Sequence, residues 1–258
     1  MGLRMGQYLP LDSPIHRLDP RTKLLVTIIL GLACFKAPYP WGLIMILSMI
    51  LILVIVSRIP GYHYWQDLKP FMPIILITVT IQLFLTPGDY LTGYHPLIIT
   101  QQGITAAMGL LMRITGILLL ARWLTATTRP VELTNSLETL LKPLKRTGFP
   151  LHELLMIMTL SLSFIPLLGE ETVRIHRAQA ARGANLRTGN LLTGMKRIIS
   201  IIVPLLRASM QRAAYLAEAM ENRGYEAGGH RTHLYQQKLA LCDYGLFSTV
   251  VAVVVLIL

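Results

Sequence analysis

The chain has 258 residues, of which 53% are hydrophobic and only 14% are charged, and its mean hydropathy is +0.54. These values are typical of an integral membrane protein and exclude an ordinary soluble domain. The formal net charge of +11 would indicate nucleic acid in a soluble protein. Here no aromatic residues alternate with the basic ones, so we expect no nucleic-acid partner. Cytoplasmic loops of membrane proteins collect lysine and arginine, which explains the same charge.

Five apolar segments are candidates for membrane-spanning helices, because a span needs about 20 mostly apolar residues. They cover roughly residues 22–36, 41–57, 71–86, 103–125 and 239–258. Helix-breaking prolines punctuate the gaps at Pro38, Pro40, Pro60, Pro70 and Pro87. The predicted fold is an all-α integral membrane protein with about five transmembrane helices, together with long cytoplasmic or interfacial helices.

The basic residues predict the orientation of these spans. Four precede the first span, two lie between the second and third, and sixteen fall between Arg122 and Lys238. Only Lys36 lies on the opposite side, so the positive-inside rule places the N-terminus and residues 126–238 in the cytoplasm. We therefore divide the chain into membrane helices at 1–127, a cytoplasmic module at 128–235 and a last membrane helix at 236–258.

Residues 151–168 and 191–206 are also apolar, but each runs directly into a charged stretch. This pattern predicts two long amphipathic helices, over 151–182 and roughly 190–223. A continuous helix over 151–182 would extend about 48 Å at a rise of 1.5 Å per residue. We favour an interfacial or cytoplasmic position for both helices, and two additional spans are the alternative.

Two Arg-Gly pairs mark the expected ends of these helices, at Arg182-Gly183 and Arg223-Gly224, 41 residues apart. A single pair has a structural explanation, because arginine complements the helix dipole and glycine closes the helix in a left-handed conformation. Two pairs in one hydrophobic protein favour a functional role. A guanidinium at a helix tip can make forked hydrogen bonds with the carboxylates of a partner protein.

Two further positions carry charge at or inside the predicted spans. Asp19 followed by Pro20 is typical of a helix start, and a capped membrane helix explains that pair without any other function. Arg113 lies within the fourth span, where charge is costly, and shares a helix face with Thr105, Gly109 and Gly116. Contact with a partner and hydrogen bonding to neighbouring backbone carbonyls both remain open for Arg113.

Several sequence patterns argue against ATP hydrolysis, metal binding and redox chemistry by this chain. The glycine-rich stretch at 189–196 has Met195 where a phosphate-binding loop needs lysine, so we expect no ATP hydrolysis by this chain. His230 and His233 have no carboxylate or thiol nearby in the sequence and are typical of a polar linker. Cys34 and Cys242 form no CxxC pair. We therefore expect no bound metal or cofactor and no catalytic residue.

The start of the chain resembles a known family. Gly6-Gln7-Tyr8 and residues 13–25 closely resemble the N-terminal signature of the transmembrane T component of energy-coupling factor (ECF) transporters, the CbiQ-like family. The signature includes six consecutive residues: Leu18, Asp19, Pro20, Arg21, Thr22 and Lys23. The resemblance continues through the spans to both Arg-Gly pairs and so covers essentially the whole chain.

The resemblance implies a non-catalytic subunit of an ATP-driven importer in a bacterial or archaeal cell membrane. In this family a membrane-embedded S component captures a vitamin or metal ion, and two ATP-binding-cassette subunits bind ATP and Mg²⁺ and hydrolyse the ATP. The T component connects them through two Ala-Arg-Gly helix ends, each docked on one ATPase. Ala181-Arg182-Gly183 matches that motif fully, whereas Asn222-Arg223-Gly224 has asparagine in the alanine position.

Two other classes of function compete with this interpretation. A stand-alone secondary transporter or channel would need a path of ionisable residues through the membrane, and Arg113 is nearly alone there. A membrane scaffold without ATPase partners is the second alternative. The substrate cannot be read from this chain, because the S component would bind it. The N-terminal signature is closer to that of modules shared by several S components than to that of a dedicated metal importer.

Overall fold

The computed structural model describes residues 13–16, 18–87, 100–141, 151–183, 191–225 and 241–257. The side chains of residues 151, 152 and 191–197 are outside this description. The described elements are helices: α1 (Pro20–Lys36), α2 (Trp41–Val56), α3 (Gly61–Leu68), the 3-10 helix η1 (Lys69–Phe71), α4 (Met72–Leu85), α5 (Gln101–Thr127), α6 (Pro130–Leu140), α7 (Leu151–Ala181), α8 (Leu191–Asn222) and α9 (Leu241–Ile257).

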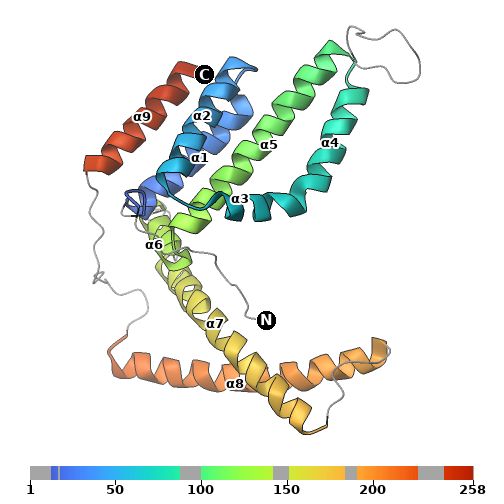
Figure 1. The fold of residues 1–258 in the computed structure, drawn as a ribbon. Helices are drawn as coiled ribbons and strands as arrows, with labels where there is room; N and C mark the ends of the chain where they lie inside the picture. Colours follow the sequence, from blue (N-terminus) through green and yellow to red (C-terminus); the bar gives the residue numbers. More distant parts are fainter. Residues whose placement is uncertain are drawn as a thin grey trace. The chain divides into compact units, whose positions relative to one another are not determined.

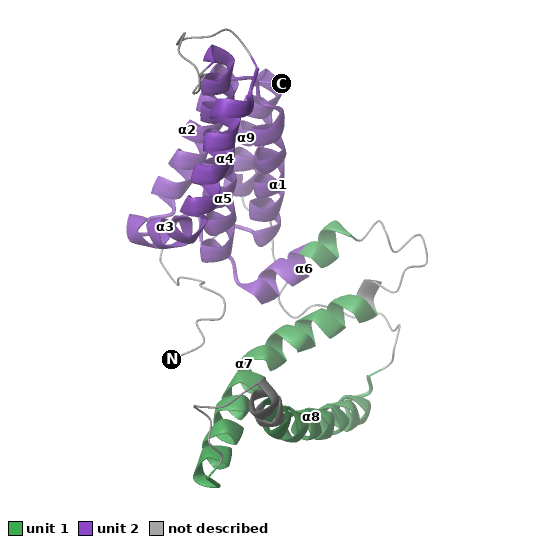
Figure 2. Ribbon diagram, turned by 90° about the vertical axis from the view of Figure 1, so that its right-hand side faces the viewer, with its two compact units in different colours: residues 1–5, 137–234 green, residues 6–136, 235–258 purple. Residues whose placement is uncertain are grey.

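The helices form two compact units, drawn in different colours in Figure 2. We call the first the bundle; its described part comprises residues up to 136 together with α9. We call the second the crossed-helix unit, and it holds the end of α6 together with α7 and α8.

The apolar core of the bundle lies between α1, α2, α5 and α9, which run side by side in Figure 1. These helices form because their sequences are almost uninterrupted apolar runs, and proline begins or precedes each of α1, α2 and α3. The least exposed core side chains, at 2% or less, include Val26, Leu30, Leu43, Ile46, Ile50, Leu120, Trp123 and Val250. The outward faces of the same helices expose large apolar side chains, as lipid-facing surfaces do.

The five predicted spans correspond to α1, α2, α4, α5 and α9, with ends within two or three residues of those expected. Among the described residues, three helical runs are long and apolar enough to cross a bilayer: Gly61–Leu85, Gln101–Thr127 and Glu153–Ala181. Trp41–Val56 and Leu241–Ile257 are shorter apolar helices. The chain is therefore an all-α, multi-pass membrane protein, as predicted.

Helix α3 was not predicted. Its sequence contains Tyr62, His63, Gln66 and Asp67 among the apolar residues, so it has no continuous hydrophobic run. It is held instead by packing, because Tyr64 is only 7% exposed and belongs to a small cluster with Ile59 and Ala126. Helix η1 then leads directly into α4, so that Gly61–Leu85 is one helical run.

The two long helices of the crossed-helix unit were predicted closely. Helix α7 has 31 residues and α8 has 32, and they continue past Pro166 and Pro204. At 1.5 Å per residue each extends about 45–50 Å. They cross one another in both Figure 1 and Figure 2. By length and composition α7 also meets the requirement for a span, so its interfacial position stays a prediction.

Helix α5 packs closely on its neighbours through glycine, which generates a prediction about stability. A Cβ atom on Gly116 would lie 3.2 Å from Leu47 Cδ2, 3.4 Å from Cys34 Sγ and 3.5 Å from Ile50 Cδ1. Gly116→Val should therefore overpack the bundle and lower its free energy of unfolding by about 1–3 kcal/mol. Denaturant unfolding in mild detergent measures this. Gly31→Val is the matched control, because a Cβ there meets nothing within 4 Å; equal loss in both variants would contradict the predicted packing.

Candidate functional site

Helix α7 ends in the sequence Ala181-Arg182-Gly183. Gly183 has φ +82°, and its N–H donates to the carbonyl of Ala180 at 3.0 Å, while the N–H of Arg182 donates to the carbonyl of Ala178 at 3.2 Å. The helical hydrogen bonds therefore continue to Arg182, and the backbone turns at the next residue. This is the left-handed closure that glycine adopts without steric cost.

Helix α8 ends in the same way, with a complete Schellman motif. Gly224 has φ +71° and donates its N–H to the carbonyl of Glu221 at 2.9 Å, and the N–H of Tyr225 donates to the carbonyl of Met220 at 3.0 Å. The carbonyls of Met220 and Glu221 are thus satisfied by backbone N–H groups. The side chain of Arg223 is not needed to cap these two carbonyls.

The predicted left-handed closure is confirmed at both glycines. Arg182 and Arg223 occupy the equivalent position at the end of each helix, and both are exposed, as are the preceding Ala181 and Asn222. A Cβ on either glycine would meet nothing within 4 Å, so the need for glycine comes from the backbone conformation alone. Each helix end presents a guanidinium to solvent that is available to a carboxylate or carbonyl.

An ion pair joins the two long helices where they cross. Arg212 Nη2 on α8 lies 2.8 Å from Glu171 Oε2 on α7. Arg174, one turn further along α7, approaches the other carboxylate oxygen of Glu171 at 3.4 Å. Sequence analysis did not identify this pair, because 41 residues separate its members and α7 offers Glu170 as an equally good candidate.

The N-terminal signature forms the capped start of α1, as predicted. Asp19 accepts a hydrogen bond from the N–H of Arg21 at 2.9 Å, and Pro20 is the first helical residue. Thr22 is buried, and Leu18 packs against the apolar core of the bundle. These contacts position the helix and its neighbours; a docking role for the signature is not needed to explain them.

Two groups of the signature region, the Lys23 ammonium and the backbone N–H of Asp19, bond to residues that are distant in the sequence. Lys23 is 1% exposed, and its Nζ donates to the carbonyls of His16 at 3.2 Å and Thr127 at 3.1 Å. The N–H of Asp19 donates to Asp243 Oδ1 at 3.0 Å. These bonds tie the start of α1 to the end of α5 and the start of α9. No pattern in the sequence pairs residues so distant.

Arg113 is hydrogen-bonded to backbone carbonyls. Its Nε donates to the carbonyl of Cys34 at 3.2 Å and its Nη2 donates to that of Ala37 at 3.3 Å, at the end of α1. Gly109 and Gly116 are buried on the same side of α5, where they let α1 and α2 approach. Thr105, expected on that face, is exposed.

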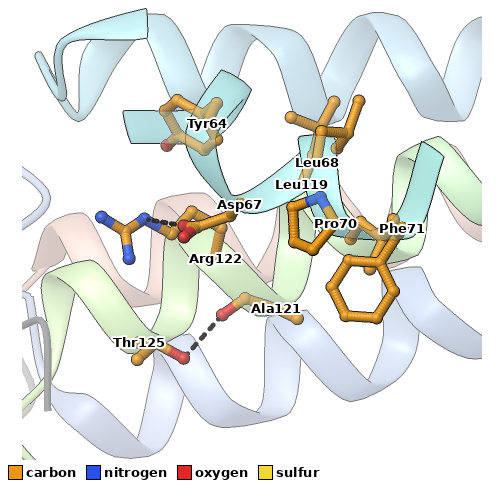
Figure 3. Close-up of a pocket in the computed structure, with 10 residues that line it drawn as sticks. Tyr64, Asp67, Leu68, Pro70, Phe71, Leu119, Ala121, Arg122 and Thr125 are labelled. Atoms are coloured by element: carbon orange, nitrogen blue, oxygen red, sulfur yellow. Dashed lines mark hydrogen bonds and ion pairs between the residues drawn. The ribbon is translucent and has the colours of Figure 1, made fainter. Parts of the chain in front are cut away.

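A groove between α3 and α5 holds a second ion pair that sequence analysis missed. Arg122 Nε lies 2.9 Å from Asp67 Oδ2, and the side chain of Arg122 is 7% exposed. Figure 3 shows this pair beside Tyr64, with the rings of Pro70 and Phe71 further along the groove. The groove has a volume of about 440 Å³ and is mostly apolar, so the pair anchors α3 on α5 rather than forming a polar binding site.

The remaining predictions concern the histidines, the glycine-rich stretch and the cysteines, for which we expected no catalysis and no metal binding. His230, His233 and Gly189 lie outside the described residues. Within the described ranges, no group of three His, Cys, Asp or Glu side chains is placed to hold a metal ion. Cys34 is buried and Cys242 is exposed, and both are free thiols.

The fold and the two exposed helix ends define a multi-pass helical membrane protein with paired arginine tips. A family model described as "Cobalt transport protein" (CbiQ) matches residues 12–234. The energy-coupling factor transporter transmembrane protein EcfT of Heliobacterium modesticaldum is 37% identical over 255 residues, which cover 99% of this chain and 96% of the relative. EcfT proteins of Streptococcus equi subsp. equi (40%; 99% and 94% covered) and Clostridium kluyveri (40%; 94% and 90% covered) are similar over nearly their full lengths.

The chain therefore belongs to the CbiQ family, whose members include the transmembrane components of energy-coupling factor transporters. The predicted resemblance is confirmed. This makes the protein a membrane subunit of a transporter complex.

The left-handed glycines generate a prediction about the helix ends. Gly183→Ala and Gly224→Ala should each destabilise the closing turn by about 1 kcal/mol, because a Cβ is strained at positive φ. Hydrogen–deuterium exchange should become about fivefold faster in the last turn of the altered helix. Gly224→Asn is the matched control, since asparagine tolerates this conformation. Unchanged exchange in both alanine variants would show that the turns do not depend on glycine.

Proposed function

We propose that this chain is the coupling subunit of an ATP-driven ECF importer. It transmits the movement of two ATP-binding-cassette subunits to a membrane-embedded S component, for uptake of a vitamin or other micronutrient. The observation that carries the proposal is the pair of exposed arginines, Arg182 and Arg223, at equivalent ends of two crossing helices. The similarity to EcfT proteins over nearly the whole chain supports it.

The chemistry of the helix ends fits docking on protein surfaces. Since backbone N–H groups pair with the carbonyls of Ala178, Ala180, Met220 and Glu221, the guanidinium groups are not needed there and are available for a partner. Hydrogen bonds from arginine to carboxylate are worth about 1.5–3 kcal/mol when water is excluded. Two such tips, one for each ATPase subunit, fit a partner that is itself a dimer. ATP and Mg²⁺ would then be bound by the partner subunits and not by this chain.

The crossed-helix unit also exposes apolar surface that fits a membrane partner. On α8 five large apolar side chains are more than half exposed and repeat at the spacing of one helix face: Ile198, Ile199, Ile202, Val203 and Leu206. Helix α7 exposes Ile157 and Ile165 in its apolar half. Contiguous apolar surface of this kind marks contact with protein or lipid. We assign it to the S component and the surrounding bilayer, with α7 and α8 on the cytoplasmic side.

Reversing the two arginine charges tests the docking. In the double variant Arg182→Glu, Arg223→Glu, the ATPase subunits should no longer co-purify with this chain, and ATP-dependent uptake should be lost. Of the single variants, Arg182→Glu should have the larger effect, because its motif is intact, whereas Asn222 alters the second motif.

Arg177→Glu and Arg207→Glu together are the matched control, since both residues are exposed arginines on the same two helices but away from the tips. This control pair should keep the ATPases and support uptake. A tip variant that assembles and transports normally would contradict the proposal. If the unaltered chain carries out uptake without any ATPase, the protein is a stand-alone transporter; a chain that supports no uptake is a scaffold.

A further inference from the structure

The ion pair at the helix crossing has the same spacing from both arginine tips. Arg182 follows Glu171 by 11 residues on α7, and Arg223 follows Arg212 by 11 residues on α8. At 1.5 Å per residue, both tips therefore lie about 16 Å along their helices from the ion pair. The segment of α7 from the ion pair to Arg182 is therefore as long as the segment of α8 from the ion pair to Arg223.

Glu171 is also the only buried charged side chain among the described residues of α7 and α8. It is 9% exposed, and Leu155 is the other buried side chain that the structure describes on α7. On α8 no described side chain from 198 to 225 is buried, and no described residue of either helix belongs to an apolar core cluster. The crossing is thus centred on a charge pair and not on an apolar core.

An ion pair of this kind fixes the position along each helix at which the two helices meet, but it does not fix the angle between them. The hydrogen bond from Arg212 Nη2 to Glu171 Oε2 is 2.8 Å long, and a charge-assisted bond is lost if either helix slides by one residue. Apolar side chains would tolerate such sliding, because their attraction is not directional. A contact confined to the crossing still allows the helices to rotate about it. Buried polar pairs fix register in the same manner between other packed helices.

We propose that the Glu171–Arg212 ion pair is the pivot of the two crossing helices. We call the segments from the pair to Arg182 and to Arg223 the arms. The pair is a positioning contact that keeps the two arms equal in length while the angle between the helices changes. The inference rests on the proposed function for its purpose, since equal arms suit docking on two equivalent ATPase subunits. The opposite arms extend about 20 residues back to the starts of α7 and α8, or about 30 Å. For straight helices, movement of the tips is then enlarged about twofold at the far ends.

Distances between the tips test the pivot. Spin labels are attached at Ala178→Cys and Ala219→Cys, two exposed positions on the arms, in a Cys242→Ser background of the full chain in lipid nanodiscs. In double electron–electron resonance, the starting protein should give a distance distribution whose width reflects only rotation about the crossing. Glu171→Gln should broaden this distribution, because the helices can then also slide along one another. Combining Glu171→Arg with Arg212→Glu should restore the starting width, because the pair is re-formed with its charges exchanged and the exposed Arg174 side chain can turn into solvent.

Two matched controls are Glu170→Gln and Arg207→Gln, which remove a neighbouring exposed charge from each helix and should leave the distribution unchanged. A distribution in Glu171→Gln that is as wide as that of the starting protein would overturn the pivot. Broadening that the charge exchange does not reverse would also overturn it, since the contact would then depend on shape and not on charge.

The same variants separate this inference from the proposed function. In the assembled transporter, Glu171→Gln should retain both ATPase subunits yet transport less substrate per ATP hydrolysed, and the charge exchange should recover that ratio. The distance measurement requires no partner. If the ATPases never co-purify with the unaltered chain while Glu171→Gln broadens the distances, the proposed function is wrong and the pivot stands.

Discussion

A helix must satisfy its last carbonyl groups, and this constraint decides how α7 and α8 present their ends. Gly183 and Gly224 close the two helices in the left-handed conformation, so the backbone of each closing turn provides the bonds. Arg182 and Arg223 are then exposed immediately before the turn. The proposed docking and the equal arms from the ion pair both depend on these two glycines.

Two cations of the bundle bond to backbone carbonyls. Lys23 donates to Thr127 at the end of α5 and to His16 in the turn before α1, and Arg113 donates to Cys34 and Ala37 at the end of α1. A helix end carries partial negative charge and unpaired carbonyls, so it accepts a cation where water is scarce. These bonds join helices that are distant in the sequence. They explain why charge inside the apolar segments is compatible with a packed bundle.

Local patterns predicted much of the fold. Apolar runs bounded by prolines located α1, α2, α4, α5 and α9, and Asp19-Pro20 and the two Arg-Gly pairs located helix ends, because each signal acts within a few residues. Helix α3 was missed since its stability comes from packing of Tyr64 and not from its own sequence. The pairs Arg122–Asp67 and Glu171–Arg212 depend on which helices become neighbours, and a single sequence does not contain that information.

The central claim is that the two helix ends contact two ATPase subunits, and site-specific photo-crosslinking tests it most directly. A photoreactive amino acid would replace Ala181 or Asn222, the exposed residues before the arginines, in cells that carry the whole transporter. The account predicts that each position captures an ATPase subunit, while the exposed Ala214, further from the tip of α8, captures none. Capture of no ATPase from either helix end, in a complex that transports, would contradict the account.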